Sequence, residues 1–281
     1  MKYYSVEGNS QCLDGGAMFG NAPKAMWQKW CSADEQNRIN LATRALLVEY
    51  DDGKTALFEA GVGAFFDPKM KERFAVNENE HVLIENLENL GYPHDQIDYV
   101  VLSHLHFDHA GGILSAWQEG ESLNLLFPKA EFFVSSEQWE RAKQPHFRDR
   151  ASYIPEMISL LEASGRLNLV EGASHPTLAD KAVFHYSEGH TPGLMLAEIA
   201  TEDGPMVFCS DLIPGMAWVH HAITMGYDRY PEKVIEEKIS LLNDLIEREG
   251  SLFFTHDEKV TRASVVKNEK GKFVPEAMAY A

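Results

Sequence analysis

The stretch Ser103-His104-Leu105-His106-Phe107-Asp108-His109 decides how the rest of this 281-residue chain is interpreted. It gathers three histidines and one aspartate within six residues, although the whole chain contains 12 histidines. Imidazole nitrogens and carboxylate oxygens are the ligands that first-row divalent metals prefer. The spacing lets His104 and His106 project to one side, while Asp108 and His109 turn toward a second position. The stretch therefore predicts ligands for two metal ions.

The residues just before these histidines predict how they are held. Ile97 to Ser103 form an apolar run that is typical of a buried strand. The histidines are therefore expected in a loop at the carboxyl end of that strand, where side chains are free to converge. Further upstream, the apolar spacing of residues 81–90 predicts a helix that Gly91 and Pro93 end.

Each metal needs more ligands, and three later residues can supply them. His190 stands in Gly189-His190-Thr191-Pro192-Gly193, Asp211 follows the apolar run that ends at Cys209, and His256 follows Ser251 to Thr255. Each of these residues comes after a predicted strand, as the first group of histidines does. Cys209 itself is expected in the core, because free cysteine is among the most buried residue types.

Two predicted hairpins give the chain a repeated organisation. Arg44 to Tyr50 and Thr55 to Glu59 flank an Asp-Gly step, which suits a tight turn. Leu194 to Ala200 and Met206 to Cys209 repeat this pattern in the second half. Further predictions are a helix capped by Ser135 and a final hairpin within residues 261–274. Pro231 is expected to open the longest helix, with an inward face of Val234, Ile235, Ile239, Leu242, Leu245 and Ile246.

Composition narrows the class of protein. The chain is 44% hydrophobic and carries a formal net charge of −18, which opposes binding to nucleic acid and to anionic membrane surfaces. We expect no signal peptide, because no apolar run follows a basic start at residues 1–8, and no later apolar run of the chain has the length that a membrane span needs. Its three cysteines are odd in number and far apart, which favours a reducing compartment. We therefore expect a single domain over residues 1–281, located in the cytoplasm.

The ligand residues, in this order along the chain, resemble the metallo-β-lactamase superfamily. The resemblance runs from the hairpin at Arg44 to His256 and implies an αββα sandwich, an α/β fold of two mixed sheets flanked by helices. By the motifs of that family, His104, His106 and His190 bind one metal, while Asp108, His109 and His256 bind the other. Asp211 bridges the two metals, and Asp108 passes a proton to the leaving group. Glu59, at a position where the family often has aspartate, supports the ligands.

Departures from the patterns of particular subfamilies narrow the range of activities that the resemblance implies. The dizinc β-lactamases have cysteine at the position of Asp211, and the flavodiiron oxygen reductases have glutamate at that of His106. Members that cut nucleic acid carry basic surfaces and a further region, which this chain lacks. Acyl-homoserine lactonases have tyrosine where this chain has Pro214, which offers no hydrogen-bond donor. Segments such as Asp211 to Pro214 and Gly16 to Gly20 resemble the lactonase-like and methyl parathion hydrolase-like branch.

The resulting hypothesis is a dinuclear metallohydrolase that uses a metal-bridging hydroxide to cleave a carboxyl ester or lactone of a small, partly apolar substrate. The expected metal is zinc, with manganese or iron as alternatives, and a homodimer is considered. Hydrolysis of phosphotriesters or phosphodiesters ranks second, and iron-dependent oxidoreduction ranks third. The expected substrate-binding residues are Phe19, Trp27, Phe65, Trp218, His220, His221 and Tyr227. For Phe19, Trp27 and Phe65 the alternative is that they cover the sheet or form a subunit contact, and for His220 and His221 it is an exposed loop position.

Overall fold

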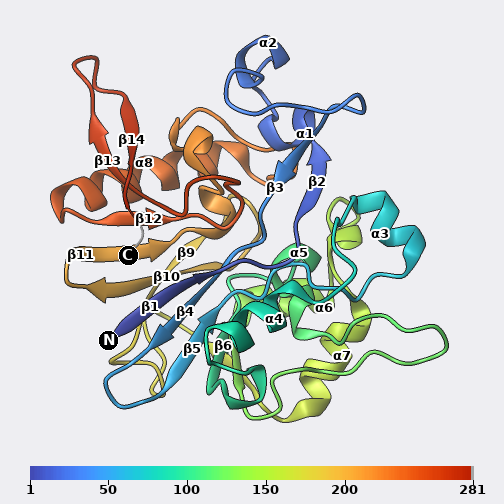
Figure 1. The fold of residues 1–281 in the computed structure, drawn as a ribbon. Coiled ribbons are helices and arrows are strands. Elements are labelled where there is room, and N and C mark those ends of the chain that lie inside the picture. The colour runs from blue at the N-terminus through green and yellow to red at the C-terminus, as the bar shows by residue number, and fades with distance from the viewer. Residues whose placement is uncertain (280–281) are drawn as a thin grey trace. The chain divides into compact units, whose positions relative to one another are not determined.

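The computed structural model describes residues 1–279, which divide into two compact units. The first unit contains residues 1–11 and 42–171, and the second contains residues 12–41 and, of the described residues, 172–279. Each unit has its own six-stranded sheet and its own hydrophobic core (Figure 1). The prediction of a single domain over residues 1–281 stays a prediction.

The sheet of the first unit has the strand order β1-β4-β5-β6-β7-β8. The predicted hairpin is confirmed, because β4 and β5 pair antiparallel around the Asp-Gly turn, and β5, β6, β7 and β8 then run parallel. Mixed pairing of this kind agrees with the predicted fold class. The strands are β1 (Lys2–Val6), β4 (Ala45–Glu49), β5 (Thr55–Phe58), β6 (Tyr99–Val101), β7 (Glu131–Ser135) and β8 (Leu167–Val170).

Helices connect the parallel strands of the first unit. The predicted helix is α4, and Ser135 caps α6 as predicted, since its hydroxyl accepts a hydrogen bond from the Gln138 amide at 3.0 Å. Leu83 and Leu87 of α4 are fully buried in the core of this unit. The helices are α3 (Pro68–Phe74), α4 (Val82–Asn89), α5 (Phe107–Ala110), α6 (Ser136–Lys143) and α7 (Pro155–Ser164), with 3₁₀ turns at η1 (His94–Gln96), η2 (Gly111–Ile113) and η3 (Arg150–Ser152).

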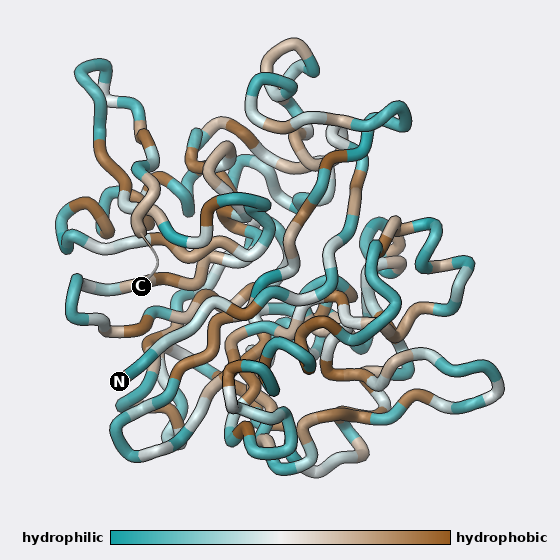
Figure 2. The backbone as a smooth tube through the Cα atoms, viewed as in Figure 1, coloured by the Kyte–Doolittle hydropathy of each residue, from teal (hydrophilic) through white to brown (hydrophobic). Residues whose placement is uncertain are grey.

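The sheet of the second unit has the strand order β14-β13-β12-β11-β10-β9. Both predicted hairpins of this unit are confirmed as the antiparallel pairs β10–β11 and β13–β14, the second reaching Ala277. Figure 2 shows hydrophobic residues along these strands and hydrophilic residues at the tip of the β13–β14 hairpin. The strands are β9 (Val183–Ser187), β10 (Leu194–Thr201), β11 (Gly204–Phe208), β12 (Ser251–Phe253), β13 (Arg262–Lys267) and β14 (Phe273–Ala277), with a small sheet of β2 (Gln11–Asp14) and β3 (Arg38–Leu41).

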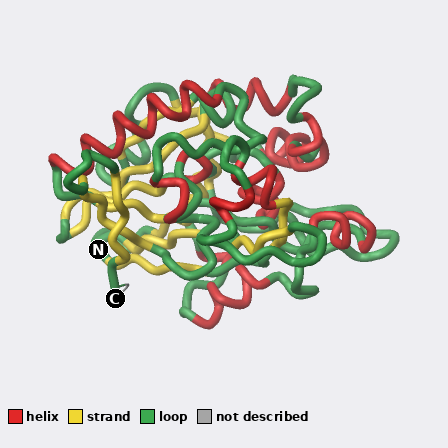
Figure 3. Tube along the Cα trace, turned by 90° about the horizontal axis from the view of Figure 1, so that it is seen from above, coloured by secondary structure: helices red, strands yellow, loops and turns green. Residues whose placement is uncertain are grey.

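The longest helix of the second unit is α8 (Pro231–Glu247), which begins at proline as predicted (Figure 3). The helix has residues in contact with β13. Its predicted inward face is only partly correct. Val234, Leu242 and Leu245 are buried, but Ile239 is 36% exposed and Lys238 is 1% exposed. The other helical segments are α1 (Gly15–Phe19), α2 (Lys24–Trp27), η4 (Ser210–Leu212) and η5 (Met216–Val219).

The two units share one pairing scheme. In the first, β1, β4 and β5 pair antiparallel in turn, and β5 pairs parallel with β6. In the second, β9, β10 and β11 pair antiparallel in turn, and β11 pairs parallel with β12. The hairpins therefore belong to a repeated arrangement, as the sequence indicates. Among residues 1–279, no helix is long and apolar enough to cross a membrane.

Candidate metal centre

In the first unit, the end of β6 delivers the histidines of residues 104–109. His106 has an extended backbone and stands at the amino end of α5, a single helical turn that contains Asp108 and His109. The prediction that all these ligands lie in a loop is therefore wrong for Asp108 and His109. A helical turn suits the spacing, because it brings the His109 amide back to the His106 carbonyl at 3.1 Å.

Two of these histidines converge on one point. The Nε2 atom of His104 lies 3.0 Å from Nδ1 of His106. Two nitrogens that bind one tetrahedral metal at the usual bond lengths are about 3.3 Å apart. One nitrogen each of His104 and His109 and one carboxylate oxygen of Glu59 also lie within 4.8 Å of one another. The first unit thus holds a compact group of metal-ligand atoms.

Three polar residues of the first unit orient these ligands. Glu59, which is 1% exposed, accepts the Ser103 amide at 2.6 Å and lies 2.8 Å from Nδ1 of His109. A carboxylate can only accept, so Nδ1 of His109 carries the proton and Nε2 is left to bind a metal. The Ser103 hydroxyl lies 2.9 Å from Nδ1 of His104, and Gln11 donates to Asp108 at 2.7 Å. The supporting role predicted for Glu59 agrees with these contacts, whereas no sequence pattern marks Gln11.

In the second unit, Asp211 lies between two histidines. Its Oδ2 atom is 3.2 Å from Nε2 of His190, and its Oδ1 atom is 3.2 Å from Nε2 of His256. The aspartate therefore directs one oxygen toward each imidazole, which is the geometry of a carboxylate shared between two cations. His190 follows β9, Asp211 lies in η4 after β11, and His256 follows β12, as predicted.

The loop that carries His190 is fixed by close contacts. Nδ1 of His190 lies 2.9 Å from Asp228, and that carboxylate also accepts the Met225 amide at 2.7 Å. Asp228 is 1% exposed and sets the His190 tautomer, as Glu59 does for His109. A Cβ atom on Gly189 would stand 2.5 Å from the Val234 backbone nitrogen, so this position requires glycine. No motif surrounds Asp228 in the sequence, which is why sequence reasoning missed it.

Pro214, the residue at which this chain departs from the lactonase pattern, holds the backbone of His256. The Pro214 carbonyl accepts the His256 amide at 3.0 Å. Cys209, two residues before Asp211, is fully buried, and its thiol donates to the Phe253 carbonyl at 3.0 Å. Burial raises the pKa of this thiol, so it stays protonated. Its predicted place in the core is confirmed.

The residues expected to bind substrate lie in different surroundings. Phe19 and Trp27 are buried in the second core, where their rings stack at 5.4 Å, and Phe65 is buried in the first core. Trp218 and His220 line a cleft of about 610 Å³ within the second unit. His221 packs edge-on against Phe273 at 5.8 Å, and Tyr227 is 41% exposed.

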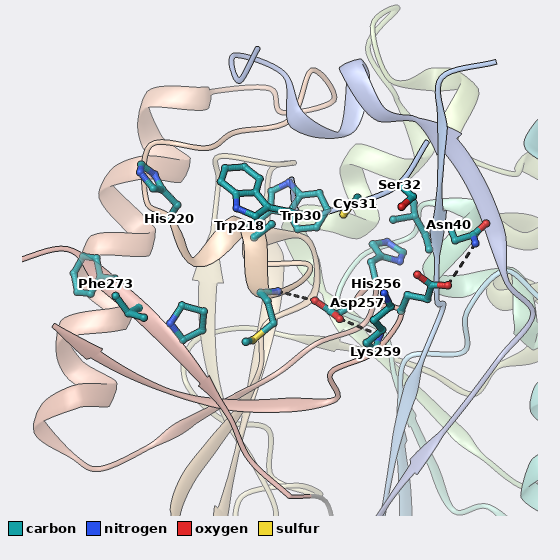
Figure 4. Close-up of a pocket in the computed structure, with 16 residues that line it drawn as sticks. Trp30, Cys31, Ser32, Asn40, Trp218, His220, His256, Asp257, Lys259 and Phe273 are labelled. Carbon is teal, nitrogen blue, oxygen red and sulfur yellow. Dashed lines mark hydrogen bonds between the residues drawn. The ribbon is translucent and has the colours of Figure 1, made fainter. Parts of the chain in front are cut away.

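Apolar and charged side chains together line that cleft. Trp30, Met216, Trp218 and Phe273 contribute to its walls, and His256 and Asp257 line it as well (Figure 4). Burial, followed by the nearby Asp257 and Glu258, raises the pKa of the Cys31 thiol in this cleft to about 11. Cys31 is therefore protonated at neutral pH and is a poor nucleophile. Burial and the neighbouring His221 lower the pKa of His220.

Comparison with known proteins gives the family. The model of the metallo-beta-lactamase superfamily matches residues 39–256, a range that includes every predicted metal ligand. The chain belongs to the metallo-beta-lactamase superfamily. Its curated relatives in this superfamily include an N-acyl homoserine lactonase of Bacillus cereus, which is 24% identical over 85% of this chain and 88% of the relative. Another, from Bacillus thuringiensis, is 26% identical over 78% and 82%.

Solved structures of the superfamily match nearly the whole chain. A protein of Staphylococcus aureus described as a probable metal-dependent hydrolase has a TM-score of 0.86 and 27% identity, over 99% of this chain and 98% of that one. The dizinc quorum-quenching lactonase AidC has a TM-score of 0.76 and 18% identity, over 99% and 95%, and supports the fold alone. The chain is thus a metallo-beta-lactamase-fold hydrolase with lactonase relatives and groups of histidine and aspartate suited to metals.

Proposed function

We propose that the chain is a dinuclear metal-dependent hydrolase of carboxyl esters or lactones. His104, His106 and His190 bind one cation in this proposal, Asp211 bridges, and the second cation has the ligands Asp108, His109 and His256. The observation that carries it is the position of Asp211, with one oxygen 3.2 Å from His190 and the other 3.2 Å from His256. Zinc is the proposed metal, because nitrogen and carboxylate ligands at this spacing suit it.

The residues of the chain divide the chemical work. Bound divalent cations supply an ionised water as nucleophile and polarise the bond to be cleaved. Glu59 and Asp228 keep the Nε2 atoms of His109 and His190 unprotonated, so that both can act as ligands. Asp108, held by Gln11 at 2.7 Å, is the group proposed to pass a proton to the leaving oxygen.

A small and partly apolar substrate is supported by two observations. The curated relatives are named N-acyl homoserine lactonases. The second unit also has a cleft of about 610 Å³, lined by Trp30, Trp218 and Phe273 together with His256, and this volume is in the usual range for small-molecule sites. Because Pro214 cannot donate a hydrogen bond, His220, His221 and Tyr227 are the proposed donors to the substrate carbonyl.

The test combines metal analysis with a substrate panel. Protein purified without added metal should contain about two metal ions per chain. It should hydrolyse lactones and aryl esters with apolar substituents faster than phosphotriesters or β-lactams. Faster cleavage of phosphotriesters would favour the hypothesis that the protein hydrolyses organophosphates. Iron together with oxygen consumption would instead indicate an oxidoreductase, and saturation at one metal per chain would exclude the dinuclear centre.

A further inference from the structure

Lys238 is buried in the middle of α8, where a lysine is unusual. Its side chain is 1% exposed, and its Nζ atom donates to the Trp218 carbonyl at 2.9 Å and to the Ile223 carbonyl at 2.6 Å. Lysine is almost never fully buried unless it is paired. These two contacts tie the segment of residues 218–223 to the helix.

The burial of this ammonium group has a cost that packing does not explain. Desolvation lowers the pKa of Lys238 to about 7, and the negative charge of Asp228 opposes that shift. A methionine has a similar length and would fill the space without placing a charge in the interior. What the lysine adds is therefore its two hydrogen bonds to the segment and its attraction for the Asp228 carboxylate.

The neighbouring residue of α8 holds the other segment that leads to His190. Glu237 accepts hydrogen bonds from the Ser187 hydroxyl at 2.6 Å, from the Glu188 amide at 2.8 Å and from the Gly189 amide at 3.2 Å. Consecutive side chains of one helix thus fix both segments. Glu237 holds the loop that carries His190, and Lys238 holds the segment that leads to Asp228.

Asp228 connects these contacts to the predicted ligand. Its Oδ1 atom lies 2.9 Å from Nδ1 of His190, and its Oδ2 atom accepts the Met225 amide at 2.7 Å. Met225 follows Ile223 by two residues, so a shift of the Ile223 carbonyl away from Lys238 would move the amide that holds Asp228. The path from Lys238 to His190 is therefore short and made of buried hydrogen bonds.

We propose that Lys238 is a positioning residue for His190: it fixes residues 218–223 and the Asp228 carboxylate at the place from which that carboxylate orients the imidazole. The proposal rests on the proposed function in one respect, since it treats His190 as a metal ligand. Lys238 does not touch substrate in this proposal and acts through Asp228.

The test compares Lys238→Met with Lys233→Met, which makes the same substitution at an exposed position of the same helix. Histidine-selective ¹⁵N labelling reports the Nδ1 proton of His190 directly, without metal or substrate. Competition with a chelator gives zinc affinity, and circular dichroism with thermal unfolding checks that each variant is folded.

We expect Lys238→Met to remain folded, to alter the His190 Nδ1 signal, and to bind the zinc that His190 would hold about 10- to 100-fold less tightly, as changes behind a metal ligand do. The rate constant kcat should fall more than KM rises, because the substrate contacts are kept. Lys233→Met should match the parent in every measurement. An unchanged His190 signal together with parental zinc affinity would overturn the proposal.

A double-mutant cycle covers the case in which Lys238→Met folds poorly. Lys238→Gln keeps a donor at this position and is expected to restore part of the zinc affinity. Combined with Asp228→Asn, either Lys238 variant should add little to the loss caused by Asp228→Asn alone, because both changes act on one path. Fully additive losses would show that Lys238 acts elsewhere. If the parent protein hydrolyses no ester or lactone but its His190 signal still depends on Lys238, the proposed function is contradicted and the positioning role is not.

Discussion

The β4–β5–β6 region of the first unit and the β10–β11–β12 region of the second follow one pairing scheme and end in the same kind of residue. Phe58 pairs with Val101 in the first, and Phe208 pairs with Phe253 in the second. A predicted ligand histidine stands three residues after the second member of each pair, as His104 and as His256. Equivalent strand ends thus carry equivalent candidate ligands.

The two regions differ at the end of the preceding strand. Glu59 directly follows β5 and reaches His109 at 2.8 Å, so its carboxylate orients a ligand. At the equivalent position after β11 stands Cys209, which packs in the core, and the carboxylate comes two residues later as Asp211. Both turns contain a residue with positive φ, Glu59 at 68° and Ser210 at 42°. A shift of two residues along the turn thus separates a carboxylate that contacts one histidine, Glu59, from a carboxylate that faces two histidines, Asp211.

The strongest test of this difference removes the carboxylate that both histidines of the second unit face. Asp211→Ala should abolish hydrolysis and lower the occupancy of both metals, because a bridging ligand serves two cations. Elemental analysis and turnover measure the effect. His146→Ala, at an exposed position of the first unit, should leave metal content unchanged. Retention of two metals and a near-parental rate by Asp211→Ala would refute the bridging role.

A second test compares the two orienting carboxylates. Glu59→Gln and Asp228→Asn should each weaken metal binding about 10- to 100-fold, because each leaves one ligand histidine without its negative partner. A two-step zinc titration should assign the losses to different metals, one bound by His109 and the other by His190. Glu156→Gln and Glu232→Gln, in the exposed first turns of α7 and α8, are the controls. Equal losses in both steps from either variant would contradict separate roles.

A third test concerns the donor that replaces the lactonase tyrosine. His220 lines the cleft, and its buried Nδ1 atom has no hydrogen-bond partner among residues 1–279. Its lowered pKa keeps the ring neutral at pH 7, so one nitrogen can still donate. At least one of His220→Ala, His221→Ala and Tyr227→Phe should slow turnover about tenfold or more without loss of metal. If all three variants match the parent, none of these side chains is the donor, and the substrate carbonyl would have to be stabilised by the metals and the backbone.

The smallest expected effect is a pH dependence of the free energy of unfolding that comes from Lys238. It is measured on metal-free protein, so that metal binding does not contribute. The folded pKa of Lys238, about 7, lies below its ordinary value of 10.5. Between these values the unfolded state binds more protons, so the free energy of unfolding should rise with pH, by at most about 1.4 kcal/mol per pH unit. Urea titrations of metal-free protein at several pH values measure this rise. The difference between the parent and Lys238→Met should flatten below pH 7, and a constant difference across the range would contradict a lowered pKa of Lys238 in the folded state.

The sequence predicted those features that depend on neighbouring residues. The Asp-Gly step at residues 52–53 predicts a hairpin because it supplies the backbone a tight turn needs, and Ser135 predicts a helix start through one local hydrogen bond. The candidate ligand residues of the first unit stand within one hexapeptide, so their spacing alone indicates them. Those of the second unit were found because each follows a strand and matches a family motif.

The rest depends on contacts between distant residues. Asp228 reaches His190 across 38 positions of sequence, and no local pattern marks it. Lys238 stands where the apolar spacing of α8 assigns a polar face, yet carbonyl groups of another segment bury it. The substrate-binding role of Phe19 and Trp27 stays a prediction, and the sequence gives no sign that both are buried in the second core and stack on each other.

That aromatic stack gives the second unit an optical label of its own. Phe19 lies between two indoles, with Trp27 at 5.4 Å and 6° on one contact and Trp218 at 4.5 Å and 9° on the other. Aromatic rings in a fixed chiral environment absorb left and right circularly polarised near-ultraviolet light unequally. This near-ultraviolet circular dichroism vanishes when packing loosens. Lys238 holds the carbonyl of Trp218, so near-ultraviolet dichroism should respond to movement of that segment while the backbone signal of the strands remains.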